Sequence, residues 1–194
     1  MEVQQRYLKP LLGAIVIVIV DFASKWWAYY HVSPQQTTPI IGDFIGLRLV
    51  FNPGAAFSLG ESFTRGITIF ALLFVFVLIP YLLRRMQGRI NLIAITLLWG
   101  GATGNLIDRL FYEPGWLAGH VVDFIAYSTW FVGNVADIAI TIGAVLLFFS
   151  AISSSNTKEQ KAASSIKEGE KNPLDTSAEI VSKEKPVDTE KSDA

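Results

Sequence analysis

Four long apolar segments dominate the first 154 residues of the chain, and polar residues and glycine are frequent between them. A helix that crosses the hydrocarbon core of a bilayer, about 30 Å thick, needs roughly 20 apolar residues. Each segment reaches or approaches that length, so the pattern predicts a mainly α membrane protein with four transmembrane helices. They run near Leu8 to Tyr30, Gly66 to Leu83, Ile90 to Leu110 and Val132 to Ile152.

Two of these segments carry a residue pattern that needs interpretation. Pro80 lies inside the second segment and is expected to kink it, which neighbouring helices tolerate. Arg6 and Lys9 precede the first segment, as in a secretory signal peptide. However, Asp21 and Lys25 follow where a cleavage site would need small residues. We therefore interpret the first segment as a permanent helix.

Basic residues flank the predicted helices on one side. Arg6 and Lys9 precede the first helix, residues 84–89 hold three arginines between the second and third, and lysines follow the fourth. The positive-inside rule then places both termini in the cytoplasm. The two long connections, near residues 31–65 and 111–131, are predicted to lie on the outer side.

Composition separates the chain into two parts. Half of the residues are apolar, and the absence of cysteine excludes disulfides and thiolate metal sites. Residues 155–194 contain seven Lys and nine Asp plus Glu, with almost no large apolar residues. Such a composition cannot bury enough apolar surface to fold. We predict a folded domain over residues 1–154 and a disordered, charged cytoplasmic tail over residues 155–194.

Asp123 and Asp137 stand in or beside apolar sequence of membrane length. An ionised carboxylate is costly there, so its usual explanation is a functional site. Two acids fourteen residues apart suggest a dyad. A close pair of carboxyl groups shares one proton and titrates as a unit. One member can then take a proton from water while the other donates to a carbonyl, without a metal or cofactor.

Other polar positions reach a similar depth. With a rise of 1.5 Å per residue from the cytoplasmic end of its helix, Asp21 lies about 18 Å along the first helix. Asn105 and Asp108 lie about 24 and 28 Å along the third, and Asp137 about 22 Å along the fourth. Polar side chains of three helices are therefore expected to meet in the outer part of the membrane.

Several of these side chains allow two interpretations. Asp21 and Lys25, spaced i,i+4, can form a structural ion pair or contact substrate. Asp108 can belong to the site or form an interfacial salt bridge at the helix end. Arg109 suits the gripping of a carbonyl or carboxylate, because its donors have fixed geometry. Asn134 is either a helix cap or a catalytic residue.

Residues 42–58 do not have a helical pattern. Residues 47–51 are typical of a strand and Asn52-Pro53-Gly54 of a turn. We expect a small β-sheet on the outer face of the bundle, or else an ordered surface loop. Gly100 and Gly104 form a small-xxx-small pair, which lets a neighbouring helix approach the third helix closely.

Five short segments between residues 21 and 137 together form a recognisable series. They are residues 21–25 (Asp-Phe-Ala-Ser-Lys), 52–57 (Asn-Pro-Gly-Ala-Ala-Phe), 100–109 (Gly-Gly-Ala-Thr-Gly-Asn-Leu-Ile-Asp-Arg), 121–124 (Val-Val-Asp-Phe) and 134–137 (Asn-Val-Ala-Asp). In this order they resemble the motifs of lipoprotein signal peptidase, also called signal peptidase II. Each motif alone is weak, but the five together are highly specific. Gly133 departs from the family, which usually has a Phe before the Asn.

The resemblance implies an aspartyl endopeptidase of the bacterial cytoplasmic membrane with its active site near the outer face. It would cut prolipoproteins on the amino side of a diacylglyceryl-modified Cys, among membrane lipids, and globomycin-type inhibitors would block it. No nucleic-acid partner or metal is expected. By resemblance, Asp123 and Asp137 form the catalytic dyad, and Asn105 and Arg109 hold the peptide backbone. The positions that support the site are Asp21, Lys25, Asn52, Gly54 and Asn134, to which we add Asp108.

Three other functions are weaker. An ion or proton translocator would also place acids in the membrane, but the cytoplasmic half holds nothing comparable and no inverted repeat is visible. A scaffold assembled through the glycine pair leaves both acids unexplained. A metal-dependent hydrolase is disfavoured because His31 and His120 lack zinc-ligand spacing.

Overall fold

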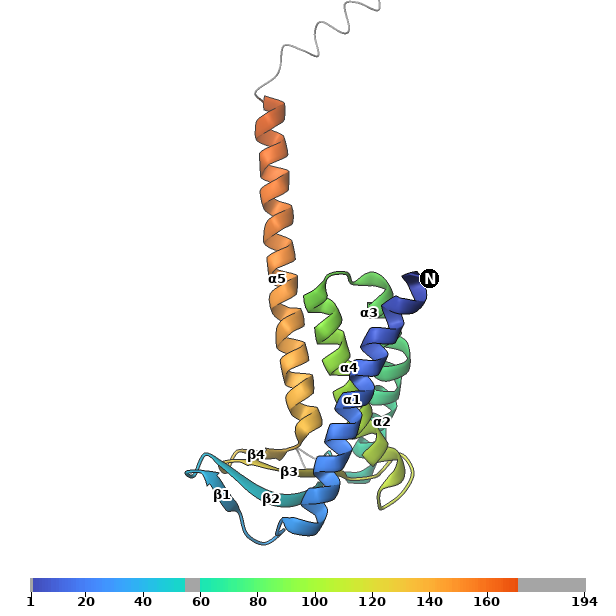
Figure 1. Cartoon of the computed structure of the whole chain (residues 1–194), viewed down its shortest axis with the longest axis vertical. Coiled ribbons are helices and arrows are strands. Elements are labelled where there is room, and N and C mark those ends of the chain that lie inside the picture. The colour runs from blue at the N-terminus through green and yellow to red at the C-terminus, as the bar shows by residue number, and fades with distance from the viewer. Residues whose placement is uncertain (1, 55–59, 171–194) are drawn as a thin grey trace, which may run out of the picture. The chain divides into compact units, whose positions relative to one another are not determined.

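The computed structural model describes residues 2–54 and 60–170, which form helices and one sheet (Figure 1). Four helical spans in this part of the chain are long and apolar enough to cross a membrane, as predicted: Tyr7–His31, Phe63–Arg85, Arg89–Phe111 and Val135–Ser153. The helical elements are α1 (Glu2–His31), α2 (Gly60–Leu73), the π-helical turn η1 (Phe74–Leu78), α3 (Ile79–Arg85), α4 (Arg89–Phe111) and α5 (Val135–Glu170).

The second span is one helix interrupted by η1. The amide of Ile79 donates to the carbonyl of Phe74, five residues back, instead of four. Pro80 follows directly and has no N–H to continue a regular ladder. The irregularity expected at Pro80 thus takes the form of a π-turn in the residues before it.

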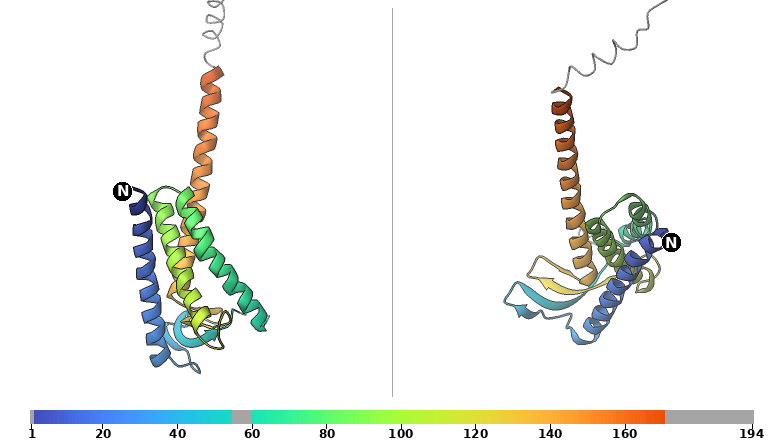
Figure 2. Two further views of the ribbon diagram at one scale, coloured as in Figure 1. Left: turned by 90° about the vertical axis from the view of Figure 1, so that its right-hand side faces the viewer. Right: turned by 45° about the horizontal axis from the view of Figure 1, so that its top comes forward.

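Helix α4 lies between α1 and the α2–η1–α3 segment and contacts both (Figure 2). Glycines allow close helix contacts, as predicted for Gly100 and Gly104. A Cβ at Gly100 would lie 2.6 Å from the Cβ of Ile17 on α1. A Cβ at Gly101 would lie 2.5 Å from the carbonyl oxygen of Ala136 on α5. Small residues therefore let α4 pack closely on α1 and on α5.

The sheet has four antiparallel strands in the order β1-β2-β3-β4. It lies at the end of the bundle where α1 and α4 finish and α5 begins, opposite the N-terminus (Figure 1). Ala28 of α1 and Val32, the residue after α1, pack against Leu49, Val122 and Phe124 of the sheet in one buried cluster. The strands are β1 (Thr38–Ile41), β2 (Ile45–Asn52), β3 (Val121–Tyr127) and β4 (Phe131–Gly133).

The sheet is larger than the sequence predicts. Only β2 was expected as a strand, whereas β3 lies inside the predicted connection 111–131 and carries Asp123. The fourth helix begins at Val135 and not near Val132, because Val132 pairs with Ala126 in the sheet. Residues 31–65 and 111–131 together supply most of the sheet.

Helix α5 continues through Glu170 and so includes residues 155–170, the first part of the predicted tail. This stretch is rich in Ala, Lys, Glu and Gln, which favour helix, and it lacks proline. Residues 151–170 belong to a second unit, separate from the unit of residues 1–150. The rest of the predicted tail, residues 171–194, lies outside the described residues.

Candidate active site

The two predicted acids lie on different elements and are joined by one amide side chain. Asp123 is on β3, and Asp137 is in the first turn of α5. Asn134 Nδ2 donates to Asp123 Oδ1 at 2.6 Å, and the backbone amide of Asn134 donates to Asp137 Oδ2 at 3.1 Å. The strand and the helix therefore present both carboxyl groups to one residue, although 14 positions separate the two acids in sequence.

Asn134 is both a cap and a member of the site. Its Oδ1 accepts the backbone N–H of Asp137 at 2.9 Å, while Asp137 Oδ2 accepts the N–H of Asn134. This reciprocal pair is a capping box with an aspartate at the third helical position. The two interpretations of Asn134 are thus compatible, since Oδ1 caps the helix and Nδ2 contacts the first acid.

A second amide holds Asp123 from the other side. Asn52 Nδ2 donates to Asp123 Oδ2 at 2.8 Å, and Asn52 Oδ1 accepts the N–H of Gly54 at 2.8 Å. Gly54 has φ of +85°, a conformation that L side chains rarely adopt. Its position therefore favours glycine, and the turn that follows β2 orients Asn52 toward the acid.

Lys25 organises the side of the network nearest α1. Its ammonium contacts Asp21 Oδ2 at 2.7 Å, Asp108 Oδ2 at 2.9 Å and Asn105 Oδ1 at 3.0 Å. An ammonium has three N–H donors, so these three acceptors use all of them. Lys25, Asp21 and Asp108 are each no more than 2% exposed. The lysine therefore joins α1 and α4 through a saturated, buried ion network, and Asp108 pairs with it.

This lysine also determines how Asn105 is oriented. Asn105 Oδ1 accepts from Lys25 and, at 3.1 Å, from Asn134 Nδ2. Because two donors hold the Asn105 oxygen, the Nδ2 of Asn105 is directed toward Asp137 and donates to Asp137 Oδ1 at 2.8 Å. The ion network thus fixes the donor that contacts the second acid.

The remaining contacts tie the helices and the sheet together. Asp21 Oδ1 accepts the N–H of Ala136 in the first turn of α5 at 2.8 Å. Asp108 Oδ2 accepts the N–H of Val122 on β3 at 3.2 Å. Each of these buried acids therefore satisfies the lysine and also one backbone donor beside a catalytic candidate.

Arg109 differs from the other nine predicted site residues. It is 9% exposed, and among the described residues its Nη1 has no hydrogen-bond partner. A Cβ built on Gly54 would lie 3.1 Å from this nitrogen, so the guanidinium stands beside the turn after β2. Its charge interacts with those of Asp123, Asp108 and Asp137. A buried guanidinium with a free N–H donor, close to Asp123 and Asp137, is suited to bind a carbonyl oxygen.

Burial changes the proton affinity of the acid on the strand. Desolvation raises the pKa of Asp123 to about 6. The hydrogen bond from Asn52 lowers this pKa, the charge of Asp137 raises it, and the hydrogen bond from Asn134 lowers it. At a pH below about 6, Asp123 is therefore mainly neutral and can donate a proton.

Asp137 has a different surrounding. It lies in the first turn of α5, where the helix dipole stabilises a negative charge. Gly133, buried before Asn134, is close to it: a Cβ at this position would lie 3.0 Å from Asp137 Oδ2. The two acids thus occupy unlike environments, which is how enzymes separate an acid from a base.

The structure brings all ten predicted residues into one region, but sequence reasoning missed a supporting residue. Thr64 on α2 is buried, and its Oγ1 donates to the carbonyl of Pro53 at 2.5 Å. Thr68, one turn later, donates to the carbonyl of Leu117 at 2.8 Å. The i,i+4 spacing of two threonines within an apolar helix was the available signal for this contact with the turn.

Comparisons with known proteins identify the family. The sequence model for signal peptidase (SPase) II matches residues 13–153. A lipoprotein signal peptidase of Rhodococcus jostii is 40% identical over 143 residues, covering 74% of this chain and 72% of the relative. Another, of Streptomyces griseus, is 42% identical over 144 residues, covering 74% and 73%.

Solved structures show the same fold. A bacterial membrane enzyme determined by the in meso method at 2.3 Å resolution superposes with a TM-score of 0.63 and 27% identity. The match covers 77% of this chain and 91% of that enzyme. Because the family model and relatives at 40% identity or more cover most of the chain, the protein belongs to the signal peptidase II family, the lipoprotein signal peptidases of bacterial membranes.

Proposed function

We propose that this lipoprotein signal peptidase is an aspartyl endopeptidase in which Asp123 and Asp137 activate a water molecule. The observation that carries the proposal is the shared contact with Asn134, which presents both carboxyl groups to one place. Each carboxyl oxygen named in these contacts has a second lone pair free for water or substrate. A water between the two acids can therefore contact both.

The unlike environments assign a role to each acid. Asp137, at the start of α5, acts as the base and takes a proton from the water as the oxygen of this water attacks the carbonyl carbon of the scissile peptide. Asp123, neutral, donates its proton to the carbonyl oxygen. When the C–N bond breaks, the proton held by Asp137 passes to the leaving amine and the hydroxyl proton of the intermediate returns to Asp123. The dyad ends in its starting protonation state.

Arg109 supports this reaction from beside the dyad. Its free Nη1 donor can hold a carbonyl of the substrate backbone, and its charge stabilises negative charge that develops in the transition state. Holding the peptide in a fixed position contributes to rate in its own right. Arg109 is therefore assigned to substrate binding, and Asn105, Asn52 and Asn134 to orienting the acids.

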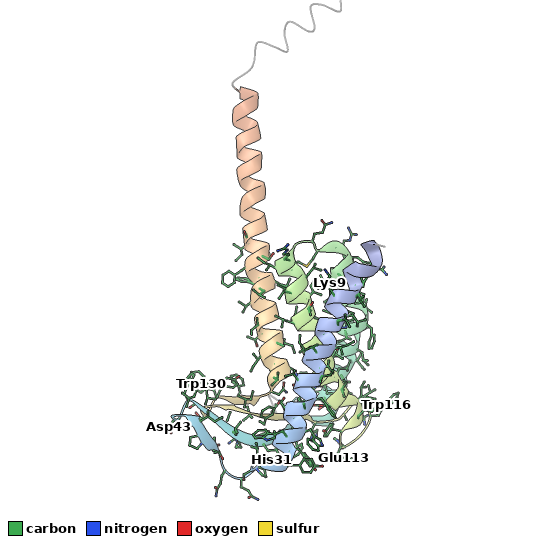
Figure 3. All side chains as sticks on the ribbon, viewed as in Figure 1. Lys9, His31, Asp43, Glu113, Trp116 and Trp130 are labelled. Carbon is green, nitrogen blue, oxygen red and sulfur yellow. The ribbon has the colours of Figure 1, made fainter. Side chains whose placement is uncertain are left out.

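The proposed substrate is a prolipoprotein whose Cys carries a diacylglyceryl group, cut on the amino side of that Cys. Its apolar signal helix and acyl chains would hold the cleavage site near the membrane surface. Lys9 lies at one end of the bundle and Trp116 and Trp130 at the other, beside the sheet (Figure 3). Cations favour the cytoplasmic face and tryptophans the interface. We infer cytoplasmic termini and an active site near the outer surface.

The proposal is tested with purified full-length protein and a diacylglyceryl-modified precursor. Asp123→Asn and Asp137→Asn should each lower kcat/KM by at least about 10²–10⁴-fold, because each removes a proton transfer. Product mass should show a new amino terminus at the lipid-modified Cys, and globomycin should inhibit the wild type. Asp43→Asn, at an exposed acid in the turn before β2, is the matched control and should cleave normally.

Two results would contradict the dyad. One is turnover near the wild-type level in either catalytic variant, provided its thermal unfolding matches that of the wild type. The other is equal loss in Asp43→Asn, which would mean that the assay responds to general damage and not to the dyad.

A further inference from the structure

A groove between α1 and α4, at the end of the bundle away from the active site, has no role in the proposed reaction. Its volume is about 620 Å³. Lys9 and Arg89 line one part of it, and Gly13, Ile17 and Leu97 are among the apolar residues that line the rest. We propose that this groove binds one anionic phospholipid, with its phosphate at the two cations and an acyl chain along the apolar wall.

The arrangement of the groove follows from two parallel helices. Lys9, Gly13 and Ile17 are spaced i, i+4, i+8 on α1, and Arg89, Ile93 and Leu97 have the same spacing on α4. Such residues share one face of a helix. Eight residues correspond to about 12 Å of helix. The groove thus offers one charged end and an apolar wall long enough for part of an acyl chain.

The wall of the groove is apolar although it contains Thr96. Thr96 Oγ1 donates to the carbonyl of Leu92 at 2.7 Å, so its hydroxyl is satisfied within the helix. Its methyl group faces α1, since a Cβ on Gly13 would lie 2.6 Å from Thr96 Cγ2. The wall therefore presents methyl and methylene groups, against which a hydrocarbon chain can pack.

Charge identifies the headgroup. Lys9 and Arg89 are both exposed, and no acidic residue is among the residues that line the groove. Among the side chains that the structure describes, neither cation forms an ion pair. A phosphate with net negative charge matches two adjacent cations, whereas the ammonium of a zwitterionic headgroup would oppose them. Lipid specificity then comes from the cations, and the apolar wall holds the chain.

The test uses the full chain in nanodiscs made from equal amounts of phosphatidylglycerol and phosphatidylcholine, followed by native mass spectrometry of retained lipid. The wild type should retain one phosphatidylglycerol about 10- to 30-fold more often than phosphatidylcholine, from about 1 kcal/mol for each cation. Lys9→Gln combined with Arg89→Gln should abolish this preference. Arg85→Gln, at an exposed arginine on α3 that stacks on Tyr81 and does not line the groove, should keep it.

A second pair of variants tests the apolar wall. Ile93→Trp should fill the groove and reduce retention of both lipids with the cations intact, because Ile93 is exposed and lines it. Ile90→Trp, at an equally exposed position on α4 outside the groove, should have no effect. All four variants should cleave precursor, so folding is checked in the same samples.

Three outcomes would overturn the proposal. They are equal retention of the two lipids by the wild type, a preference that survives loss of both cations, and a loss in Arg85→Gln as large as in the double variant. None of them depends on whether Asp123 and Asp137 act as the proposed dyad, because lipid retention is measured without cleavage.

Discussion

Helices α1 and α4 contact each other along most of the bundle, but the two ends of this contact are built differently. Near the sheet, Lys25 of α1 is held by Asp108 and Asn105 of α4 at 2.9 and 3.0 Å. Toward the other end, the side chains that meet at Gly13 and Gly100 are those of Thr96 and Ile17, and both make contact through carbon atoms. The same pair of helices thus uses charge at one end and small residues at the other.

The difference shows what each end requires. In a bilayer, apolar surface alone gives helices little reason to associate, so packing and hydrogen bonds determine their positions. The charged end orients Asn105, and through it the donor to Asp137. The apolar end needs only contact, and it leaves a groove open to lipid. Fixed geometry is therefore concentrated where the proposed chemistry takes place.

The largest expected effect comes from removing the centre of the charged end. Lys25→Met leaves the buried carboxylates of Asp21 and Asp108 without a counter-charge, which should cost about 3–5 kcal/mol of unfolding free energy. Lys9→Met removes an exposed lysine from the other end of the same helix and should change stability by less than about 0.5 kcal/mol. Thermal unfolding in detergent measures both. Equal stability of the two variants would contradict the assigned role of Lys25.

A smaller loss is expected where a glycine makes room for the network. Gly104→Ala would place a Cβ 2.6 Å from Asp21 Oδ2 and should destabilise the protein by about 1–3 kcal/mol. Gly66→Ala is the control, because a Cβ there meets nothing within 4 Å on an exposed face of α2. It should be neutral or slightly stabilising. If Gly104→Ala has the same unfolding temperature as the wild type, α4 does not approach Asp21 as closely as described.

The pH profile tests the acid on the strand. Because the pKa of Asp123 is about 6, cleavage should fall as the pH rises above about 6 and the proton donor is lost. The hydrogen bond from Asn52 lowers this pKa, so Asn52→Leu should move the alkaline limb of kcat/KM to higher pH. Such limbs belong to the coupled pair of acids.

Asn91→Leu provides the control for this profile. Asn91 lies near the start of α4, at the end of the bundle away from Asp123 and Asp137. Its side chain donates to the carbonyl of Gln87. Its pH profile should match the wild type. An unchanged alkaline limb in Asn52→Leu would show that Asp123 is not the group that titrates there.

The smallest effect is expected from the C-terminus. Deletion of residues 156–194 should leave cleavage of a lipid-modified precursor within about twofold, since all ten predicted site residues lie between positions 21 and 137. Initial rates at saturating and limiting substrate measure it. A strong defect would mean that these residues contribute to substrate binding.

The sequence by itself determined the four spans and singled out the residues of the candidate site. Runs of about 20 apolar residues are unambiguous in a membrane protein, because the bilayer sets their length. A charged residue in such a run is costly, so Asp21, Lys25 and Asp108 were conspicuous. The i,i+4 pairing of Asp21 with Lys25 is local, and the structure confirms it at 2.7 Å.

Only the tertiary structure decided how those residues meet. The Val, Ile, Phe and Tyr residues of β3 favour a strand, but its partner could not be read from the sequence, because the pairing with β2 joins residues about 70 to 80 positions apart. The same pairing places Asp123 beside Asn52, and packing of α4 on α1 gives Lys25 its second and third acceptors. Sequence specifies which groups are too costly to leave unpaired in a membrane, whereas long-range packing determines which groups satisfy them.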